Sequence, residues 1–313
     1  MSLYQNVRPD TLDGVAGNKP AVAILRNALA AADPPHVFLF SGPSGCGKTT
    51  MARIMARGLG CDVRTGGSMD YVEYNASEMR GIDVVRQIIQ DSQFEPMTGN
   101  RRCILIDECH ALTKDAMNAF LKPLEDYPKY QFYLLCTTDP GKLLKTILTR
   151  CVHVAVQPLS EDVLYNLLID AEERAGLPQT AESVLEAIVR RAAGCPRSAL
   201  NMLEQQSGMA EDQAIKCVDA FRTSEEQVID LCRMLVAGKP WGQLAALYAK
   251  VEDKDPEGVR RAMLGYLKSC LLKSATADKA GRFARMIEEL SGDTFASGEA
   301  GLLAMLYRAT EVS

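Results

Sequence analysis

The sequence lacks the long apolar runs and leader segments that mark membrane and secreted proteins. None of its 313 residues falls in a run that approaches the ~18 apolar residues of a membrane span. The start, Met1 to Asn6, has neither the charge nor the apolar core of a signal peptide. We therefore expect a cytoplasmic protein without a membrane partner. Its length favours two or three domains.

The cysteines lack the close spacing of metal sites and disulfide frameworks. There are ten, and no C-x-x-C pair occurs among them. Several stand inside apolar, strand-like runs, so we expect small buried hydrophobes in a reducing compartment. They are Cys46, Cys61, Cys103, Cys109, Cys136, Cys151, Cys195, Cys217, Cys232 and Cys270.

The chain also lacks an excess of positive charge. Its formal net charge is −5, which argues against a protein that coats nucleic acid by bulk electrostatics but leaves local basic contacts open. Residues 222–313 hold 13 Lys and Arg and 13 Asp and Glu, so the whole imbalance lies before them. A neutral block rich in Leu and Ala is better suited to packing on protein than on DNA.

What the sequence does contain is a phosphate-binding loop. Gly42-Pro43-Ser44-Gly45-Cys46-Gly47-Lys48-Thr49 stands between the apolar run 37–40 and a helical pattern over 51–59. This G-x-x-x-x-G-K-[ST] pattern predicts backbone N–H groups that converge on an anion, with Thr50 extending the segment. Lys48 adds charge at the β- and γ-phosphates, and the Thr49 hydroxyl is placed to hold Mg²⁺. The Lys-Thr pair disfavours the alternative, a glycine-rich turn that binds nothing.

A second apolar run ends in two acids. Residues 103–108 read Cys-Ile-Leu-Ile-Asp-Glu, the Walker B position of a P-loop fold. Buried carboxylates need a cation, so a purely structural explanation is weak. We expect Asp107 to lie beside the Mg²⁺ held by Thr49, and Glu108 to polarise the attacking water.

Strands and helices alternate through this part of the chain. Further strands are expected over 71–75, over 131–138, where Thr138 ends the run, and over 152–156, just after Arg150. The alternation predicts a parallel sheet with helices on both faces and a ligand at its carboxyl edge. Thr138 would then reach between Walker B and the γ-phosphate.

From Ser160 onward only helical patterns follow. Ser160 is expected to cap a helix to Gly176, Thr180 to cap a second to Ala193, and Pro196 to open a third. These helices would form a lid on the nucleotide-binding core. We expect a core over 1–157, a helical lid over 158–221 and a helical collar for oligomerisation over 222–313.

Two further segments have a possible binding role. The arm over 7–18, with Arg8, Pro9, Val15 and Gly17, can close over an adenine, although composition alone favours a plain surface arm. An amphipathic helix is expected over 82–94.

Arg80 stands in the turn before that helix, and Arg86 lies on it. Both could touch DNA phosphates. The alternative is an ordinary solvated helix face.

Together these motifs resemble the AAA+ ATPases and, within them, the sliding-clamp loaders. Residues 75–86 look like the N-A-S-x-x-R-G-I-D-V-V-R stretch of the small subunits of replication factor C. Residues 134–143 are similar to the bacterial gamma/tau subunit, and Arg8-Pro9 with residues 15–17 resembles the adenine-closing arm of the family. The match covers roughly residues 7–205. The C-terminal block matches only in length, position and helical character.

The resemblance implies a fold and a set of roles. The fold would be an α/β P-loop AAA+ core with a parallel sheet, followed by an α-helical lid and an α-helical collar. The implied roles are phosphate and Mg²⁺ binding by Lys48 and Thr49, metal binding by Asp107, water activation by Glu108, sensor 1 for Thr138, sensor 2 for Arg197, an arginine finger toward a neighbouring subunit for Arg150, and DNA backbone contacts for Arg80 and Arg86.

The chain departs from the family pattern at three places. Thr149 replaces the Ser of the Ser-Arg-Cys motif, and Val7 stands where an aromatic residue often precedes Arg-Pro. Only Cys61 lies where the gamma/tau subunit carries a four-cysteine zinc module, so we expect that module to be absent. A compact loader subunit without this module or a long tail would suit a phage.

The implied function is that of an ATPase motor subunit. With ATP and Mg²⁺ it would open a sliding clamp and place it on primer-template DNA, together with identical copies and at least one different loader subunit. A hexameric branch-migration or unwinding motor is one alternative, which the Asn-Ala-Ser and Thr-Arg-Cys stretches disfavour. A structural loader subunit that does not hydrolyse ATP is the other, and the intact P-loop and Walker B count against it.

Overall fold

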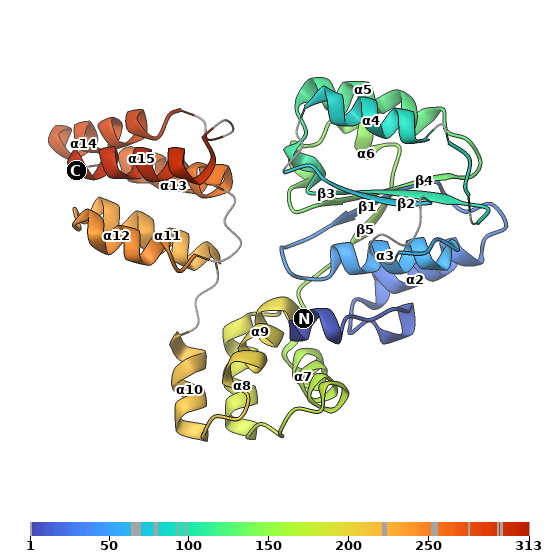
Figure 1. The fold of residues 1–313 in the computed structure, drawn as a ribbon, viewed down its shortest axis with the longest axis horizontal. Coiled ribbons are helices and arrows are strands. Elements are labelled where there is room, and N and C mark those ends of the chain that lie inside the picture. The colour runs from blue at the N-terminus through green and yellow to red at the C-terminus, as the bar shows by residue number, and fades with distance from the viewer. Residues whose placement is uncertain are drawn as a thin grey trace. The chain divides into compact units, whose positions relative to one another are not determined.

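The computed structural model describes residues 2–63, 70–77, 81–92, 94–97, 99–220, 224–251, 256–274, 276–292, 294 and 297–312. The chain divides into two compact units, 1–219 and 220–313 (Figure 1). Each unit has its own clusters of buried hydrophobic residues. Among the described residues, no helix is long and apolar enough to cross a membrane. The finer division into core, lid and collar stays a prediction.

The first unit is built on a five-stranded sheet in which all the observed strand pairs are parallel, as predicted. The strand order is β2-β3-β4-β1-β5. The strands are β1 (Val37–Ser41), β2 (Tyr71–Asn75), β3 (Arg102–Asp107), β4 (Gln131–Thr137) and β5 (Val152–Ala155). In register, Ser41 pairs with Thr137 and Asn75 with Asp107, which brings the carboxyl ends of these strands to one edge. Glu108 and Thr138 each follow directly after a strand end.

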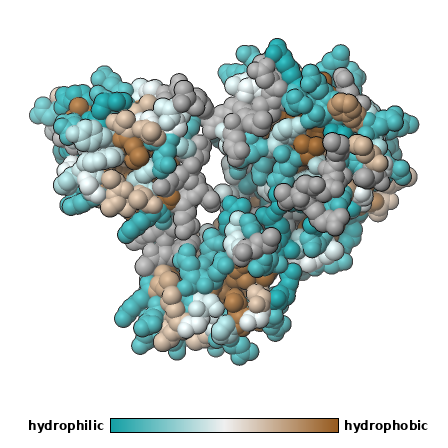
Figure 2. Space-filling view, viewed as in Figure 1, coloured by the Kyte–Doolittle hydropathy of each residue, from teal (hydrophilic) through white to brown (hydrophobic). Residues whose placement is uncertain are grey.

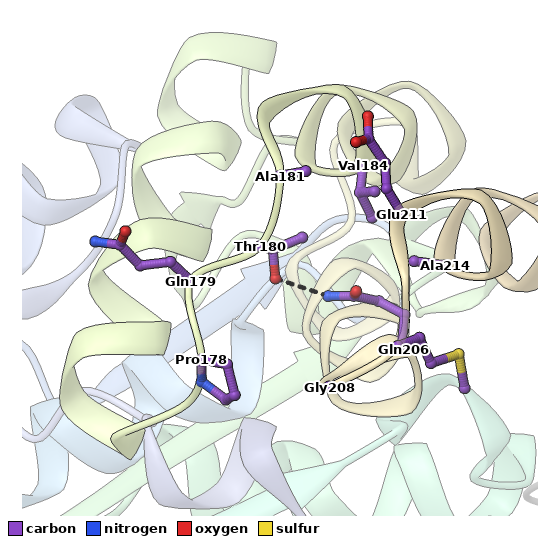
Figure 3. Close-up of a pocket in the computed structure, with 10 residues that line it drawn as sticks. Pro178, Gln179, Thr180, Ala181, Val184, Gln206, Gly208, Glu211 and Ala214 are labelled. Atoms are coloured by element: carbon purple, nitrogen blue, oxygen red, sulfur yellow. Dashed lines mark hydrogen bonds between the residues drawn. The ribbon is translucent and has the colours of Figure 1, made fainter.

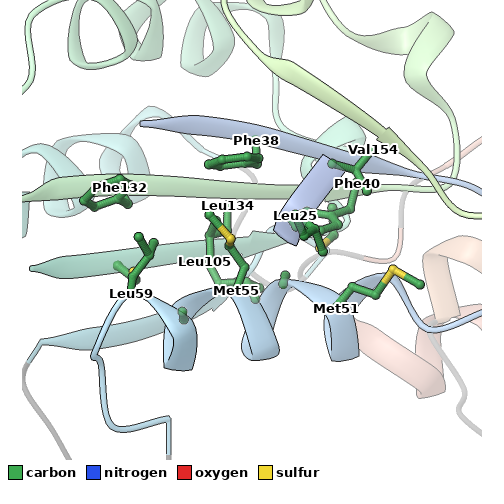
Figure 4. Packing of buried hydrophobic residues seen from close by; sticks show 14 of the residues in the cluster. Leu25, Phe38, Phe40, Met51, Met55, Leu59, Leu105, Phe132, Leu134 and Val154 are labelled. Carbon is green, nitrogen blue, oxygen red and sulfur yellow. The ribbon is translucent and has the colours of Figure 1, made fainter. Parts of the chain in front are cut away.

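Helices cover both faces of this sheet (Figure 1). They are α2 (Lys19–Ala30) and α3 (Lys48–Gly58) on one face, and α4 (Ile82–Ser92), α5 (Lys114–Glu125) and α6 (Lys145–Leu148) on the other. Because side chains alternate along a strand, Phe38 and Phe40 of β1 join the cluster with α3, shown in Figure 4, whereas Leu39 faces α5. Met55 of α3 is fully buried there, and burying such a side chain contributes roughly 1.5–3 kcal/mol.

The remaining helices of this unit lie before the sheet, in short connections between its strands, and after it. They are α1 (Leu3–Asn6), the short 3-10 helices Leu12–Gly14, Cys109–Ala111 and Pro140–Lys142, then α7 (Glu161–Ala175), α8 (Glu182–Ala192), α9 (Pro196–Gln206) and α10 (Glu211–Ala220). The region expected to hold about three lid helices therefore contains α7 to α10. Pro196 opens α9, as predicted.

Of the two predicted helix caps, Ser160 is confirmed in position, whereas Thr180 is wrong. Ser160 stands at the N-cap position of α7, but its side chain makes no capping hydrogen bond. The N-cap residue of α8 is Ala181, and the Thr180 hydroxyl instead accepts a hydrogen bond from Gln206 Nε2 at 2.9 Å (Figure 3). A side chain with a tertiary partner within reach is no longer available to its own helix. This bond lies in a lid pocket of about 340 Å³, which is lined by none of the residues predicted to bind nucleotide.

The second unit is helical. Its elements are α11 (Ser224–Val236), α12 (Trp241–Tyr248), α13 (Pro256–Leu272), α14 (Ala277–Glu289) and α15 (Gly298–Glu311), packed around buried residues such as Leu231, Met263 and Leu302. On the face seen in Figure 2, hydrophilic side chains dominate and apolar ones form small scattered groups. Scattered apolar side chains are normal on a folded protein and mark no binding surface by themselves.

A buried charge network ties this second unit together. The carboxylate of Glu257 in α13 accepts hydrogen bonds from Arg260 Nη2 at 2.6 Å, from Arg261 Nε at 2.8 Å and from Thr294 Oγ1 at 3.0 Å. Arg260 also donates to the carbonyl of Leu290, just after α14, at 2.7 Å. These donors, Arg260 first, outweigh burial and lower the pKa of Glu257 to about 2.

Replacing Glu257 with glutamine is expected to destabilise the protein at neutral pH by about 3 kcal/mol. The folded-state pKa of about 2 lies below the ordinary value of 4.5, so this stability is present above pH 4.5 and is lost as the pH falls toward 2. Denaturant unfolding of wild type and Glu257→Gln at pH 7 and pH 3 should show the difference narrowing in acid. Exposed Glu288 of α14 supplies the control variant, Glu288→Gln. An equal loss in the control, or a loss independent of pH, would contradict the network's role.

Candidate functional site

The loop between β1 and α3 folds tightly against the end of β5. Gly42 has φ 150°, and a Cβ atom there would lie 2.0 Å from the carbonyl oxygen of Val156. Only glycine fits that position. The loop then leads into α3, which begins at Lys48. The N-terminus of α3, with its unpaired N–H groups, is thereby directed at the space beside the carboxyl edge of the sheet, as an anion site requires.

Lys48 is buried, with 5 % of its surface exposed, and its Nζ donates to the carbonyl of Pro43 at 2.9 Å. A buried ammonium group held against a carbonyl still calls for an anionic partner. A phosphate oxygen fits that requirement. The residues of the loop therefore suit a polyphosphate ligand.

Thr49 and Asp107 meet at the same edge. The Thr49 hydroxyl donates to Asp107 Oδ2 at 2.8 Å, although the two residues are 58 positions apart in the sequence. The other oxygen of Asp107 accepts the backbone N–H of Glu108 at 2.9 Å. A hydroxyl and a carboxylate in contact are the oxygen ligands that Mg²⁺ takes beside phosphates. These two residues fit the metal.

Glu108 occupies a constrained position just after β3. Its φ is 50°, in the left-handed region that non-glycine residues adopt at a cost. Thr138 Oγ1 donates to Glu108 Oε2 at 3.3 Å, and His110 Nδ1 lies 3.3 Å from the same oxygen. Burial first, and the neighbouring charge of Asp107 second, raise the pKa of Glu108. A carboxylate with a raised pKa at a fixed position is suited to accept a proton.

His110 is a site residue that the sequence reasoning did not select. Its Nδ1 lies 3.1 Å from the Thr137 hydroxyl, which also accepts the backbone N–H of Asp139 at 3.0 Å. The ring thus connects the ends of β3 and β4. The sequence feature that could have identified His110 is a polar residue two positions after Glu108, the second Walker B acid.

Arg197 of α9 approaches the P-loop from the lid. Its backbone N–H donates to the carbonyl of Gly45 at 3.4 Å, and its guanidinium lies 5.5 Å from the ring centroid of Tyr4. The charge of Arg197 also acts on Glu108 and lowers its pKa, in opposition to burial. The structure therefore brings Arg197 close to the P-loop and Walker B. Tyr4, which supports it, was not singled out from the sequence.

The N-terminal arm lies between core and lid. Burial, followed by repulsion from Arg53 and Arg197, lowers the pKa of Arg8, so three guanidinium groups share this region. Asn18 exchanges two hydrogen bonds with the backbone of Gln157, at 2.8 and 3.0 Å.

The other arm residues pack locally. Pro9 contacts Gly14, Val15 packs on the core, and Gly17 lies directly against Leu159. Contact of the arm with adenine stays a prediction.

Arg150, another predicted site residue, has its partners on α5 and α6. Arg150 Nε donates to Glu125 Oε1 of α5 at 2.8 Å, and its Nη1 donates to the carbonyl of Thr146 at 2.6 Å. Arg86 is exposed on α4. Arg80 lies outside the described residues. Their roles toward a neighbouring subunit and DNA stay predictions.

Three relatives and one family model connect these observations to known proteins. Residues 63–160 match the family described as DNA polymerase III, delta subunit. The chain is 30 % identical over 295 residues to the DNA polymerase III subunit tau of Bacillus subtilis, which covers 87 % of this chain and 52 % of the relative. This chain is a homologue of the gamma and tau subunits of DNA polymerase III. The predicted resemblance to bacterial clamp-loader subunits is confirmed.

Two other relatives agree. The gamma/tau subunit of Mycobacterium tuberculosis is 29 % identical over 305 residues, covering 90 % of this chain and 53 % of the relative. The tau subunit of Escherichia coli is 31 % identical over 256 residues, covering 75 % and 39 %. The chain thus spans about half the length, or less, of these gamma/tau homologues.

Among solved structures, the RuvB Holliday junction branch migration motor of Thermotoga maritima is similar, with a TM-score of 0.58 and 20 % identity. The match covers 78 % of this chain and 86 % of RuvB. At this sequence identity, the structural similarity supports the AAA+ fold but not a function for this chain. The predicted AAA+ fold is confirmed.

Proposed function

We propose that this chain is the ATPase motor subunit of a sliding-clamp loader. The observation that carries the proposal is the meeting of Thr49, Asp107, Glu108 and Thr138 at one edge of the sheet. Two hydrogen bonds between sequence-distant residues join them, Thr49 to Asp107 and Thr138 to Glu108. The homology to gamma and tau subunits favours the loader over the alternatives. ATP with Mg²⁺ is the proposed ligand, and the cytoplasm the proposed location.

The residues divide the chemical work as follows. The P-loop backbone and Lys48 hold the phosphates, and Thr49 with Asp107 holds Mg²⁺, which when bound neutralises phosphate charge. Glu108 orients the attacking water and accepts its proton. The hydrogen bond from Thr138 keeps the Glu108 carboxylate in place, and Arg197 adds positive charge from the lid.

The proposed partners are the sliding clamp, primer-template DNA, identical copies of this chain and at least one different loader subunit. The proposal is tested by measuring ATP hydrolysis by the assembled complex, with and without clamp and primer-template DNA. We expect stimulation by both together. A hydrolysis rate that does not change when the clamp is added would favour a branch-migration motor. Absence of hydrolysis in the assembled complex would favour a structural subunit.

Removal of the charges of Arg80 and Arg86 is expected to weaken DNA binding alike for all sequences. Phosphate contacts release counterions, so the double alanine variant should flatten the plot of log affinity against log salt by about one unit per lost contact. The measurement is fluorescence anisotropy of primer-template DNA with the assembled complex. The double variant Lys279→Ala/Arg285→Ala, at exposed positions on α14, is the charge-matched control. An unchanged slope in the double variant would assign both arginines to a solvated surface.

A further inference from the structure

Two cysteines meet where the P-loop contacts the lid. Cys46 belongs to the P-loop, and Cys195 is the N-cap residue of α9. The two thiols interact, since each shifts the pKa of the other. Cys195 Sγ also lies 3.7 Å from the carbonyl oxygen of Ser44, and a Cβ atom on Gly45 would be only 2.6 Å from that sulfur. The P-loop therefore wraps closely around the Cys195 thiol.

The surroundings of Cys195 favour its thiolate. The Ser198 hydroxyl donates to Cys195 Sγ at 3.3 Å. The interaction with Cys46 first, then the hydrogen bonds with Ser198 and the backbone of Arg197, outweigh burial and lower the pKa of Cys195 to about 5. The N-terminus of a helix has the same effect on a cysteine. The pKa of Cys46, in contrast, is raised by the interaction with Cys195 and by burial, which favours its protonated form.

We propose that Cys46 and Cys195 are an oxidisable pair, which hydroperoxides convert into a disulfide between P-loop and lid. In the first step the Cys195 sulfur attacks one peroxide oxygen, an S–O bond forms, the O–O bond breaks, and hydroxide leaves and is protonated to water. In the second step the Cys46 sulfur attacks the sulfenic sulfur, an S–S bond forms, the S–O bond breaks, and the hydroxyl leaves as water with the proton of Cys46. Two thiols lose two electrons, and one hydrogen peroxide becomes two waters.

Access distinguishes Cys195 from Cys61 and Cys103, whose thiols also interact with each other. Those two side chains are 5 % and 0 % exposed, inside the cluster beneath α3. Cys195 is only half-buried. A reactive thiolate needs both a low pKa and access, so oxidation should begin at Cys195.

The disulfide would act on the nucleotide site, a consequence that rests on the proposed function. Cys46 is followed directly by Gly47 and Lys48, whose backbone and ammonium group are expected to hold phosphate. Closing an S–S bond of about 2.05 Å pulls this loop toward α9 and fixes the lid in one position. Nucleotide binding should weaken until a thiol reductant opens the bond.

Mass spectrometry tests the modification without reference to nucleotide. Trypsin yields peptides 27–48 and 192–197, each with a single cysteine. After hydrogen peroxide and non-reducing digestion, we expect these two peptides joined, two hydrogens lighter than their sum, and separated again by dithiothreitol. At pH 6, iodoacetamide should label peptide 192–197 first. Preferential linkage or labelling at other cysteines would overturn the proposal.

Calorimetric titration of ATP and Mg²⁺ tests the consequence. Oxidised wild type should bind ATP about tenfold or more weakly than reduced wild type. Cys195→Ser should bind ATP with the affinity of reduced wild type, and peroxide should not change that affinity. Cys217→Ser, at a half-buried position in α10, is the control and should still lose ATP affinity after peroxide. Peroxide-sensitive binding that persists in Cys195→Ser would overturn the switch. Failure of the reduced protein to bind ATP would instead contradict the proposed function and leave the linkage measurable.

Discussion

Glu108→Gln is expected to leave ATP binding intact and to reduce ATP hydrolysis by about 10²–10⁴-fold. The amide keeps an oxygen that can accept from the Thr138 hydroxyl, which reaches Glu108 Oε2 at 3.3 Å. It cannot accept the proton of the attacking water. Lys48, Thr49 and Asp107 are unchanged, so the contacts to phosphate and metal persist. The measurement pairs calorimetric ATP titration with steady-state phosphate release in the assembled complex.

A matched substitution shows whether the effect belongs to this carboxylate. Glu182 is exposed on α8, and Glu182→Gln removes the same charge from the lid surface. It should leave both binding and hydrolysis at wild-type values. Near wild-type hydrolysis by Glu108→Gln would remove Glu108 from the role of water-activating group. Loss of ATP binding would mean that the side chain organises the site instead.

Arg150→Ala and Lys48→Ala chains, each inactive alone, are expected to recover part of the ATPase activity when mixed in one assembly. An arginine finger is worth roughly 10³–10⁵ in turnover when it stabilises charge on the transferring phosphoryl group. In this chain Arg150 contacts Glu125 of α5 and Thr146 of α6. A finger serving the site of a neighbour requires copies arranged head to tail. In mixed assemblies an intact P-loop can then meet an intact finger.

The ion pair between Arg150 and Glu125 supplies a control that separates a role of Arg150 in catalysis from a role in stability alone. Glu125→Ala breaks the same pair but keeps the guanidinium, so it should retain activity where Arg150→Ala loses it. Native mass spectrometry must verify that both chains enter one assembly. No recovery in verified mixed assemblies would show that Arg150 does not act in trans. Equal losses in Glu125→Ala and Arg150→Ala would assign the pair to stability.

The sequence alone determined the features that depend on neighbours along the chain. A strand, a glycine loop and a helix start are local, so the P-loop at 42–49 and the Walker B acids could be identified from spacing. Strand alternation predicted the parallel sheet. The cap of α5 is equally local, since the hydroxyl of Thr113 accepts the Ala116 N–H of the helix that it precedes, at 3.2 Å.

Only the tertiary structure decided which distant side chains meet. Thr180 was expected to cap α8, but Gln206, 26 positions later, takes its hydroxyl. Three other residues matter because of partners on distant elements. His110 meets Thr137 at the end of β4, Tyr4 meets Arg197 on α9, and Cys195 meets the P-loop at Ser44. A side-chain hydrogen bond or charge contact acts over a few ångströms of space, and sequence spacing does not report that distance. The periodicity of the sequence predicts which helix or strand a residue belongs to. The packing of those helices and strands determines which distant side chain it contacts.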